Sequence, residues 1–153
     1  MKGFTFIELL VAVGLSLLLV GAIIVNYNSY NDDQKLKQAA LTFKNNLRFA
    51  QTQAFSGKKP SSGCTQLIGY TVSFTSSAYT IQAKCSEGMV GETWATPLPT
   101  GIIFSPLPSS FTFGVLSQGL LGSDAVTVTL AGSSKSYGIQ VSPGGDINDL
   151  GFQ

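Results

Sequence analysis

The sequence predicts an α+β protein in which a long amino-terminal helix packs on an antiparallel β head. Two observations predict this class. No proline interrupts Phe4–Phe55, and the apolar residues in the second half of this range follow a helical spacing. Beyond residue 63 the pattern changes to short runs with period two, separated by Gly, Pro and Ser clusters. A chain of 153 residues accommodates one domain with an appendage rather than two cores.

The composition excludes several classes of protein. The chain has no histidine, so it has no Ser-His-Asp or Cys-His nucleophile and no imidazole metal site. Nine Lys and Arg against eight Asp and Glu give a formal net charge of +1, without the broad basic surface of a dedicated nucleic-acid binder. The sequence contains no Gly-rich phosphate loop and no nucleophile elbow. We therefore expect neither enzymatic activity nor a required cofactor.

The first element is an apolar segment, Phe4–Val25, with the length of a membrane-spanning helix. Leu9–Val25 contains nothing more polar than Ser16. As a helix the segment would extend roughly 33 Å at ~1.5 Å per residue, which matches a bilayer core of about 30 Å. Glu8 is the exception, because an ionised carboxylate at the bilayer centre costs on the order of 2.5–3.5 kcal/mol. Nearer the interface the cost falls, but Glu8 still requires a partner.

Three interpretations of this segment compete. A secretory signal peptide would end in a small-x-small cleavage site, whereas Asn26–Tyr30 follows here instead. A plain membrane anchor explains the length and leaves Glu8 as a carboxylate that reaches toward the interface from a helix end. The third interpretation comes from a family resemblance at the amino terminus.

Residues 2–10, with the sequence Lys-Gly-Phe-Thr-Phe-Ile-Glu-Leu-Leu, resemble the class III signal of type IV pilins and pseudopilins. The resemblance implies that a membrane prepilin peptidase cleaves after Gly3 and N-methylates the new terminal residue, Phe4. It also makes Glu8 the assembly carboxylate. Physically, Glu8 of one subunit would pair with the Phe4 amine of a neighbour, so that neither charge is buried alone.

Residues 26–55 are expected to continue the helix outside the membrane. Tyr27 and Tyr30 suit the interfacial belt at the point of exit. Beyond them one apolar stripe runs along the helix and is expected to pack against a sheet. The stripe consists of Leu36, Ala40, Phe43, Leu47, Ala50 and Ala54. The turn residues Ser56–Gly63 then end the helix.

A basic ridge lies beside this stripe. Lys37, Lys44 and Arg48 fall within about 40° of one another at ~100° per residue. We expect a solvated face, with a subunit or phosphate contact as the alternative. Asp33 is spaced to pair with Lys37 one turn later.

The rest of the chain predicts five or six short antiparallel strands. The candidate strands are Leu67–Thr75, Ala78–Cys85, Ile102–Ser105, Phe111–Leu116, Ala125–Leu130 and Tyr137–Val141. Ser76 and Ser77 predict a hairpin turn between the first two. The proline-containing stretch Pro97–Pro108 is interpreted as a surface excursion between strands.

This order of elements resembles the H-type minor pseudopilin of type II secretion and related type IV minor pilins. Those proteins have a long amino-terminal helix, an all-β head and a final hairpin that ends in a Gly-containing turn. The matching residues are the last two candidate strands followed by Ser142–Asp146. The resemblance implies the lollipop shape of pilins, with the helix as the stem.

The two cysteines, Cys64 and Cys85, fall in the β head. If the leader is cytoplasmic, the head is extracytoplasmic and a disulfide is permitted, with two free thiols in a cytosolic domain as the alternative. A turn at Ser76 and Ser77 would place residue 89 opposite Cys64 in ideal register. The bridge therefore requires a bulge or an irregular approach by Cys64.

The carboxy-terminal segment offers weak candidates for ligand binding. Asp146, Asn148 and Asp149 follow Gly144 and Gly145 on an expected loop, and their oxygens suit Ca²⁺, although their spacing matches no EF-hand. Some minor-pilin relatives bind DNA through arginines near this tail. Residues 142–153 contain no Lys or Arg, so direct nucleic-acid binding is not expected by that route. Lys58 and Lys59 are weak alternatives.

Together these observations predict a structural subunit of a type IV pilus or a type II secretion-like pseudopilus, more similar to a minor than to a major subunit. Residues 1–3 form the leader, 4–25 the transmembrane assembly helix, 26–55 its amphipathic continuation and 56–153 the extracytoplasmic head. The expected partners are other pilin or pseudopilin subunits, prepilin peptidase, the inner-membrane assembly platform and, before assembly, membrane lipid.

The expected localisation is the cytoplasmic (inner) membrane before assembly and a filament or pseudopilus afterwards. Two alternatives stay open. One is a competence pseudopilin that serves DNA uptake. The other is a membrane-anchored extracytoplasmic binding module, which would keep an uncut amino terminus and would not associate through its helix.

Overall fold

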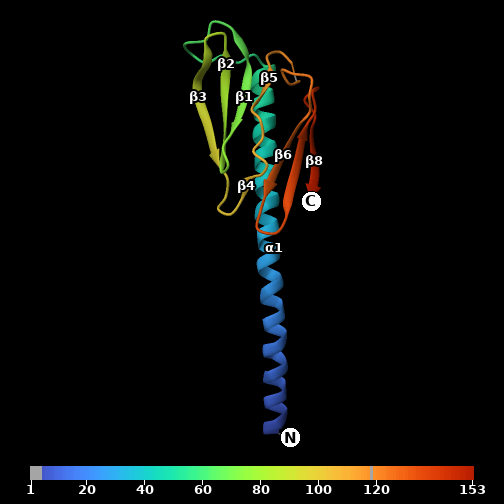
Figure 1. Ribbon diagram of the computed structural model, residues 1–153. Helices are drawn as coiled ribbons and strands as arrows, with labels where there is room; N and C mark the ends of the chain where they lie inside the picture. Colours follow the sequence, from blue (N-terminus) through green and yellow to red (C-terminus); the bar gives the residue numbers. More distant parts are fainter. Residues whose placement is uncertain (1–4, 118) are drawn as a thin grey trace.

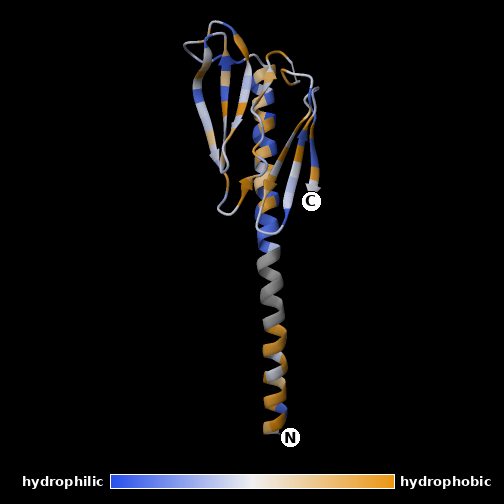
Figure 2. Ribbon diagram, viewed as in Figure 1, coloured by the Kyte–Doolittle hydropathy of each residue, from blue (hydrophilic) through white to orange (hydrophobic). Residues whose placement is uncertain are grey.

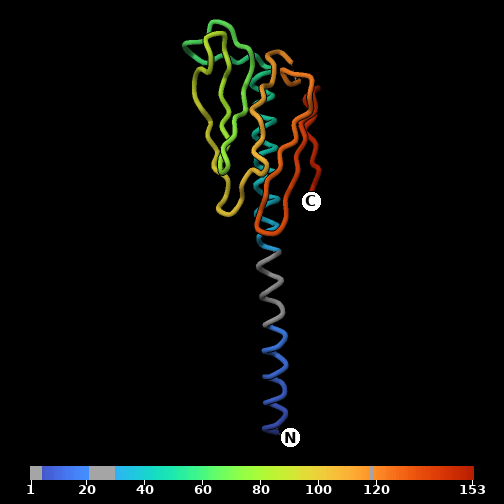
Figure 3. The backbone as a smooth tube through the Cα atoms, in the orientation of Figure 1, coloured from blue at the N-terminus to red at the C-terminus, as the bar shows by residue number. Residues whose placement is uncertain are grey.

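The computed structural model describes residues 5–117 and 119–153, and for residues 21–29 the backbone only. Helix α1 (Phe6–Phe55) begins after Thr5 and ends at the turn residues Ser56 and Gly57. Its 50 residues give a rod about 75 Å long at ~1.5 Å per residue. The sheets surround only its carboxy-terminal part, and the amino-terminal part projects from the head as a stem (Figures 1 and 3).

The head contains two four-stranded antiparallel sheets. The first has the strand order β3-β2-β1-β5 and the second the order β4-β6-β7-β8. The strands of the first are β1 (Leu67–Phe74), β2 (Ala78–Cys85), β3 (Gly88–Pro97) and β5 (Phe111–Gly114). Those of the second are β4 (Ile103–Phe104), β6 (Val126–Ala131), β7 (Ser136–Val141) and β8 (Ile147–Phe152).

The helix stripe forms the centre of the core, as its spacing predicts. The residues of the stripe are all 0–2% exposed, namely Leu36, Ala40, Phe43, Leu47, Ala50 and Ala54. Figure 1 shows the two sheets on opposite sides of α1 in projection, and both contribute buried side chains to the same cluster. Apolar residues three and four positions apart lie above one another on one face of a helix, so this face of α1 packs against the core that both sheets share.

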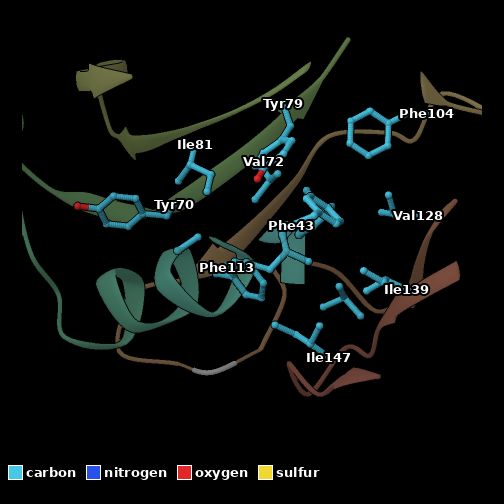
Figure 4. Close-up of a cluster of buried hydrophobic side chains, with 14 of the residues drawn as sticks. Phe43, Tyr70, Val72, Tyr79, Ile81, Phe104, Phe113, Val128, Ile139 and Ile147 are labelled. Carbon is cyan, nitrogen blue, oxygen red and sulfur yellow. The ribbon is translucent and has the colours of Figure 1, made fainter. Parts of the chain in front are cut away.

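Phe43 packs at the meeting point of the helix and both sheets (Figure 4). Its ring makes edge-to-face contacts with Phe74, Tyr79 and Phe104, with centroids 5.9, 4.9 and 5.6 Å apart. Such pairs add about 0.5–1.5 kcal/mol each beyond the burial of their area. Asn46 donates a hydrogen bond of 2.6 Å to the Tyr79 hydroxyl, which satisfies the polar end of this buried ring.

The α+β class and the helix packed on antiparallel sheets are confirmed. The expected number of strands was too low, because β3 and β8 were not predicted. Asp146–Asp149 is not wholly a loop, since β8 begins at Ile147 and the glycine turn after β7 leads into it. Within the stretch expected as a surface excursion, Pro97 ends β3 and β4 pairs with β6.

Polar contacts hold the second sheet to the helix, and they correct the expected charge pairs. Asp33 pairs with Lys135 at 2.5 Å and not with Lys37. Lys44 pairs with Asp149 of β8, so this member of the basic ridge contacts the head instead of solvent. Lys37 and Arg48 are exposed, as a solvated face requires.

Candidate assembly surface

Glu8 lies in the first turn of α1 and closes a capping box with Thr5. The Thr5 backbone N–H and its hydroxyl both donate to Glu8 Oε2 at 2.8 Å, and the Glu8 N–H donates to Thr5 Oγ1 at 3.4 Å. A capping box satisfies backbone donors that a helix start leaves without intrahelical acceptors. Glu8 therefore has a local role in starting the helix within a single chain, in addition to any role between chains.

Apolar side chains surround the described part of the stem and touch nothing in the head. The large apolar side chains from Phe6 to Val20 are 50–79% exposed. Hydrophobic colours predominate along this part of the rod (Figure 2). A helix that is apolar all round is stable only inside a protein core, among other helices or in lipid.

The polar groups of the stem are arranged to tolerate apolar surroundings. The Ser16 hydroxyl donates to the Ala12 carbonyl at 2.8 Å, so the helix itself satisfies this group.

Beside Glu8, a shallow hollow runs along one face of the helix and is lined by Ile7, Val11 and Leu15. A neighbouring helix seated there would lie directly against the Glu8 carboxylate.

Among the residues whose side chains are described, no helical stretch combines the length and the hydropathy required to cross a bilayer. The expected assembly segment, residues 4–25, extends past these residues at both ends. Gly3 and Phe4, the expected cleavage and methylation positions, lie outside the described residues.

Cys64 and Cys85 form a disulfide, which confirms the expected pairing, with their Cα atoms 5.5 Å apart. The expected irregularity is also present, because Leu67 rather than Cys64 pairs with Cys85 and the register shifts between Leu67 and Gly69. The bridge thus ties the loop before β1 to the end of β2.

Glu87 reinforces this tie from the next turn. Its Oε1 accepts a hydrogen bond from the Thr65 N–H at 3.1 Å, and the Lys59 ammonium donates to the Thr65 carbonyl at 2.6 Å. Hydrogen bonds from the Thr65 side chain, the Glu87 backbone and the Ser86 hydroxyl lower the pKa of Glu87 to about 2.

The three calcium candidates do not converge. Asp146 lies in the turn before β8 and accepts from the Ser142 hydroxyl at 3.3 Å. Asn148 and Asp149 are consecutive residues of β8, so their side chains point to opposite faces of the sheet, and Asp149 pairs with Lys44. Within residues 5–117 and 119–153, no group of three His, Cys, Asp or Glu is arranged to hold a metal ion.

No protein-family model, curated protein or solved structure shows a significant match to this chain.

The sequence interpretation did not predict two contacts at these sites. The first is the capping box, for which the sequence does contain a signal, because Thr5-Phe6-Ile7-Glu8 has the Thr-x-x-Glu pattern of a helix start. The Lys44–Asp149 ion pair joins residues 105 positions apart, and no local pattern predicts it.

Proposed function

We propose that this chain is a pilin-like structural subunit that assembles through its stem into a type IV pilus or a pseudopilus. The observation that carries the proposal is the apolar stem itself, which stands clear of the head with its large side chains at least half exposed. Burying a Val, Leu, Ile or Phe side chain is worth about 1.5–3 kcal/mol. Summed over the stem, this favours lipid before assembly and a bundle of stems afterwards.

The head supports assembly in a different way. It covers the carboxy-terminal half of α1 with two sheets and leaves the amino-terminal half available. Its disulfide is consistent with an oxidising, extracytoplasmic compartment. We therefore propose a head outside the cytoplasmic membrane, a stem within it, and the assembly platform and prepilin peptidase as partners.

The first test is mass spectrometry of the amino-terminal peptide from membrane-fraction protein. A mature chain that begins at N-methyl-Phe4 is the expected result. An intact Met1 in a host with active prepilin peptidase would overturn the proposal in favour of a membrane-anchored binding module. Subcellular fractionation then separates the two filament types, since sheared extracellular fibres indicate a pilus and retention at the membrane indicates a pseudopilus.

The second test separates the two roles of Glu8. Glu8→Gln keeps an oxygen that accepts from Thr5 and loses the charge, whereas Glu8→Ala loses both. We expect normal processing of both variants and a decrease of at least about tenfold in filament incorporation for each. The reason is that breaking a buried ion pair costs about 3–5 kcal/mol, and 1.4 kcal/mol is a factor of ten.

Thr5→Ala is the matched control for this experiment. It removes the hydroxyl of the capping box and keeps the Glu8 charge. Incorporation close to that of the unaltered chain is expected. If Glu8→Gln assembles normally while Thr5→Ala and Glu8→Ala do not, Glu8 acts through helix capping and the charge-pairing role is wrong.

A further inference from the structure

A cleft of about 340 Å³ opens between the loop that follows α1 and the sheet strands β1–β3. Lys58–Ser62, which line the cleft, belong to the loop that follows α1. This loop lies at the end of the head that is farther from the stem (Figure 1). Its volume falls at the lower end of the range of about 300–1,000 Å³ that is typical of small-molecule sites. The assembly proposal makes no use of this cleft.

Two aromatic side chains border the cleft: Trp94, which is partly exposed, and Tyr70, which is buried behind it at 2% exposure. The rings of Tyr70 and Trp94 stack with centroids 5.9 Å apart and 20° between their planes. Phe49 of α1 meets Trp94 edge-on at 5.3 Å. The Tyr70 hydroxyl, which points away from the core cluster in Figure 4, donates to the Lys58 carbonyl at 2.8 Å. Trp94 stays half-buried and borders the cleft.

The walls of the cleft are fixed as well. A Cβ atom on Gly91, whose φ is +81°, would lie 2.8 Å from Pro60, so only glycine lets this loop approach β3 so closely. The β2–β3 register shifts between Ile81 and Ala83, and Glu92, which lies in the irregular stretch of β3 opposite this shift, lines the cleft. A site that is formed before its ligand arrives avoids the cost of ordering its own side chains.

The rim carries hydroxyl groups and charges of both signs. Ser61 and Ser62 supply hydroxyls, Lys58 and Lys59 ammonium groups and Glu92 a carboxylate. Lys59 already donates to the Thr65 carbonyl. A matching ligand presents a face of C–H groups to the exposed part of Trp94 and, around its edge, groups that both donate and accept hydrogen bonds.

We propose that this cleft binds a saccharide. A pyranose ring has an apolar face whose C–H groups are attracted to the negative face of an aromatic ring, and its hydroxyls donate to a carboxylate and accept from an ammonium group. A single-stranded nucleic acid also stacks on aromatic rings, but it requires a continuous basic groove, and here a carboxylate lies among the cations.

The single tryptophan makes the proposal directly testable, because Trp94 is the only indole in the chain. The full chain, in a detergent without a sugar headgroup, is titrated separately with cellotetraose, maltotetraose and tetra-N-acetylchitotetraose while its fluorescence is recorded. A saturable change with at least one of these probes is expected. A flat response to all three saccharides would overturn the proposal. Saturation by a tyrosine-containing tetrapeptide, titrated in the same way, without saturation by any saccharide would also overturn it.

Variants then place the binding in the cleft. Calorimetric titration with the active probe is expected to show at least a tenfold loss of affinity for Trp94→Ala and a loss of about threefold to tenfold for Glu92→Gln. Asp124→Asn, an exposed change in the β5–β6 connection, is the matched control and should leave affinity unchanged. Glu92→Gln alters an exposed side chain, so the fold is retained, and unchanged affinity in both cleft variants contradicts the proposal.

Discussion

At the residue scale, Glu87 couples the loop before β1 to the β2–β3 turn through hydrogen bonds to an exposed carboxylate. The pKa of Glu87 is about 2 in the folded chain against an ordinary value of 4.5. Its ionised form is therefore the one that the fold favours. Its stabilising effect is present above the ordinary pKa and is lost as the pH falls from about 4.5 through about 2.

Glu87→Gln tests this coupling. We expect the unaltered chain to have the higher midpoint of thermal unfolding at pH 6, and the difference between the two chains to shrink steadily as the pH approaches 2. Measuring the difference, with Trp94 fluorescence as the probe, cancels the titration of the other carboxylates. A difference that stays constant from pH 6 to pH 2 would show that Glu87 does not act through its charge.

At the element scale, the disulfide secures the junction between the helix and the first sheet. Cys64 and Cys85 are 21 residues apart, and closing a loop of this length stabilises the fold by about 3 kcal/mol in the chain-entropy model. Replacing both cysteines with serine should lower the melting temperature by about 6–12 °C, since 1 kcal/mol corresponds to about 2–4 °C in a chain of this size.

Reduction of the unaltered chain is the control for the serine substitutions. It should give a melting temperature close to that of the double variant, measured by the same fluorescence scan. If the melting temperature falls in the variant but not on reduction, the serine side chains, and not the lost cross-link, disturb the contact between the loop before β1 and the end of β2.

The elements that the sequence predicts are those with a buried face of their own. The stripe of α1 and strands β1, β2, β6 and β7 carry apolar residues at the helical or strand period, because each packs against the core. β3 and β8 are edge strands with mostly exposed side chains, and each depends on one neighbour for its hydrogen bonds. Their Gly, Asn and Asp residues are those of turns, so no local pattern marks them.

The contacts at the candidate sites also divide into those that the sequence predicts and those that depend on the tertiary structure. Cysteine positions and a two-strand register were sufficient to predict the Cys64–Cys85 bridge and its irregular approach. The ion pair between Lys44 and Asp149 depends on how β8 folds back onto α1, which only the tertiary structure determines. The assembly role of Glu8 stays a prediction.

At the scale of the whole molecule, the chain consists of a polar head with its own core and an apolar rod. Inside the head, α1 alternates between buried and exposed faces, whereas from Phe6 to Val20 every large apolar side chain is exposed. Water is an unfavourable solvent for such a surface. The environment of the rod should therefore differ sharply from that of the head in the intact protein.

Cysteine labelling tests this difference, because both native cysteines are joined in a disulfide and a single new cysteine is labelled selectively. Leu17→Cys places the thiol on the stem, and Ser109→Cys places it on an exposed position of the head. With a membrane-impermeant maleimide added to the extracytoplasmic side, Ser109→Cys should react at once and Leu17→Cys only after detergent is added. Equal labelling of both positions before detergent would place the stem in water and contradict the proposed membrane and filament environments.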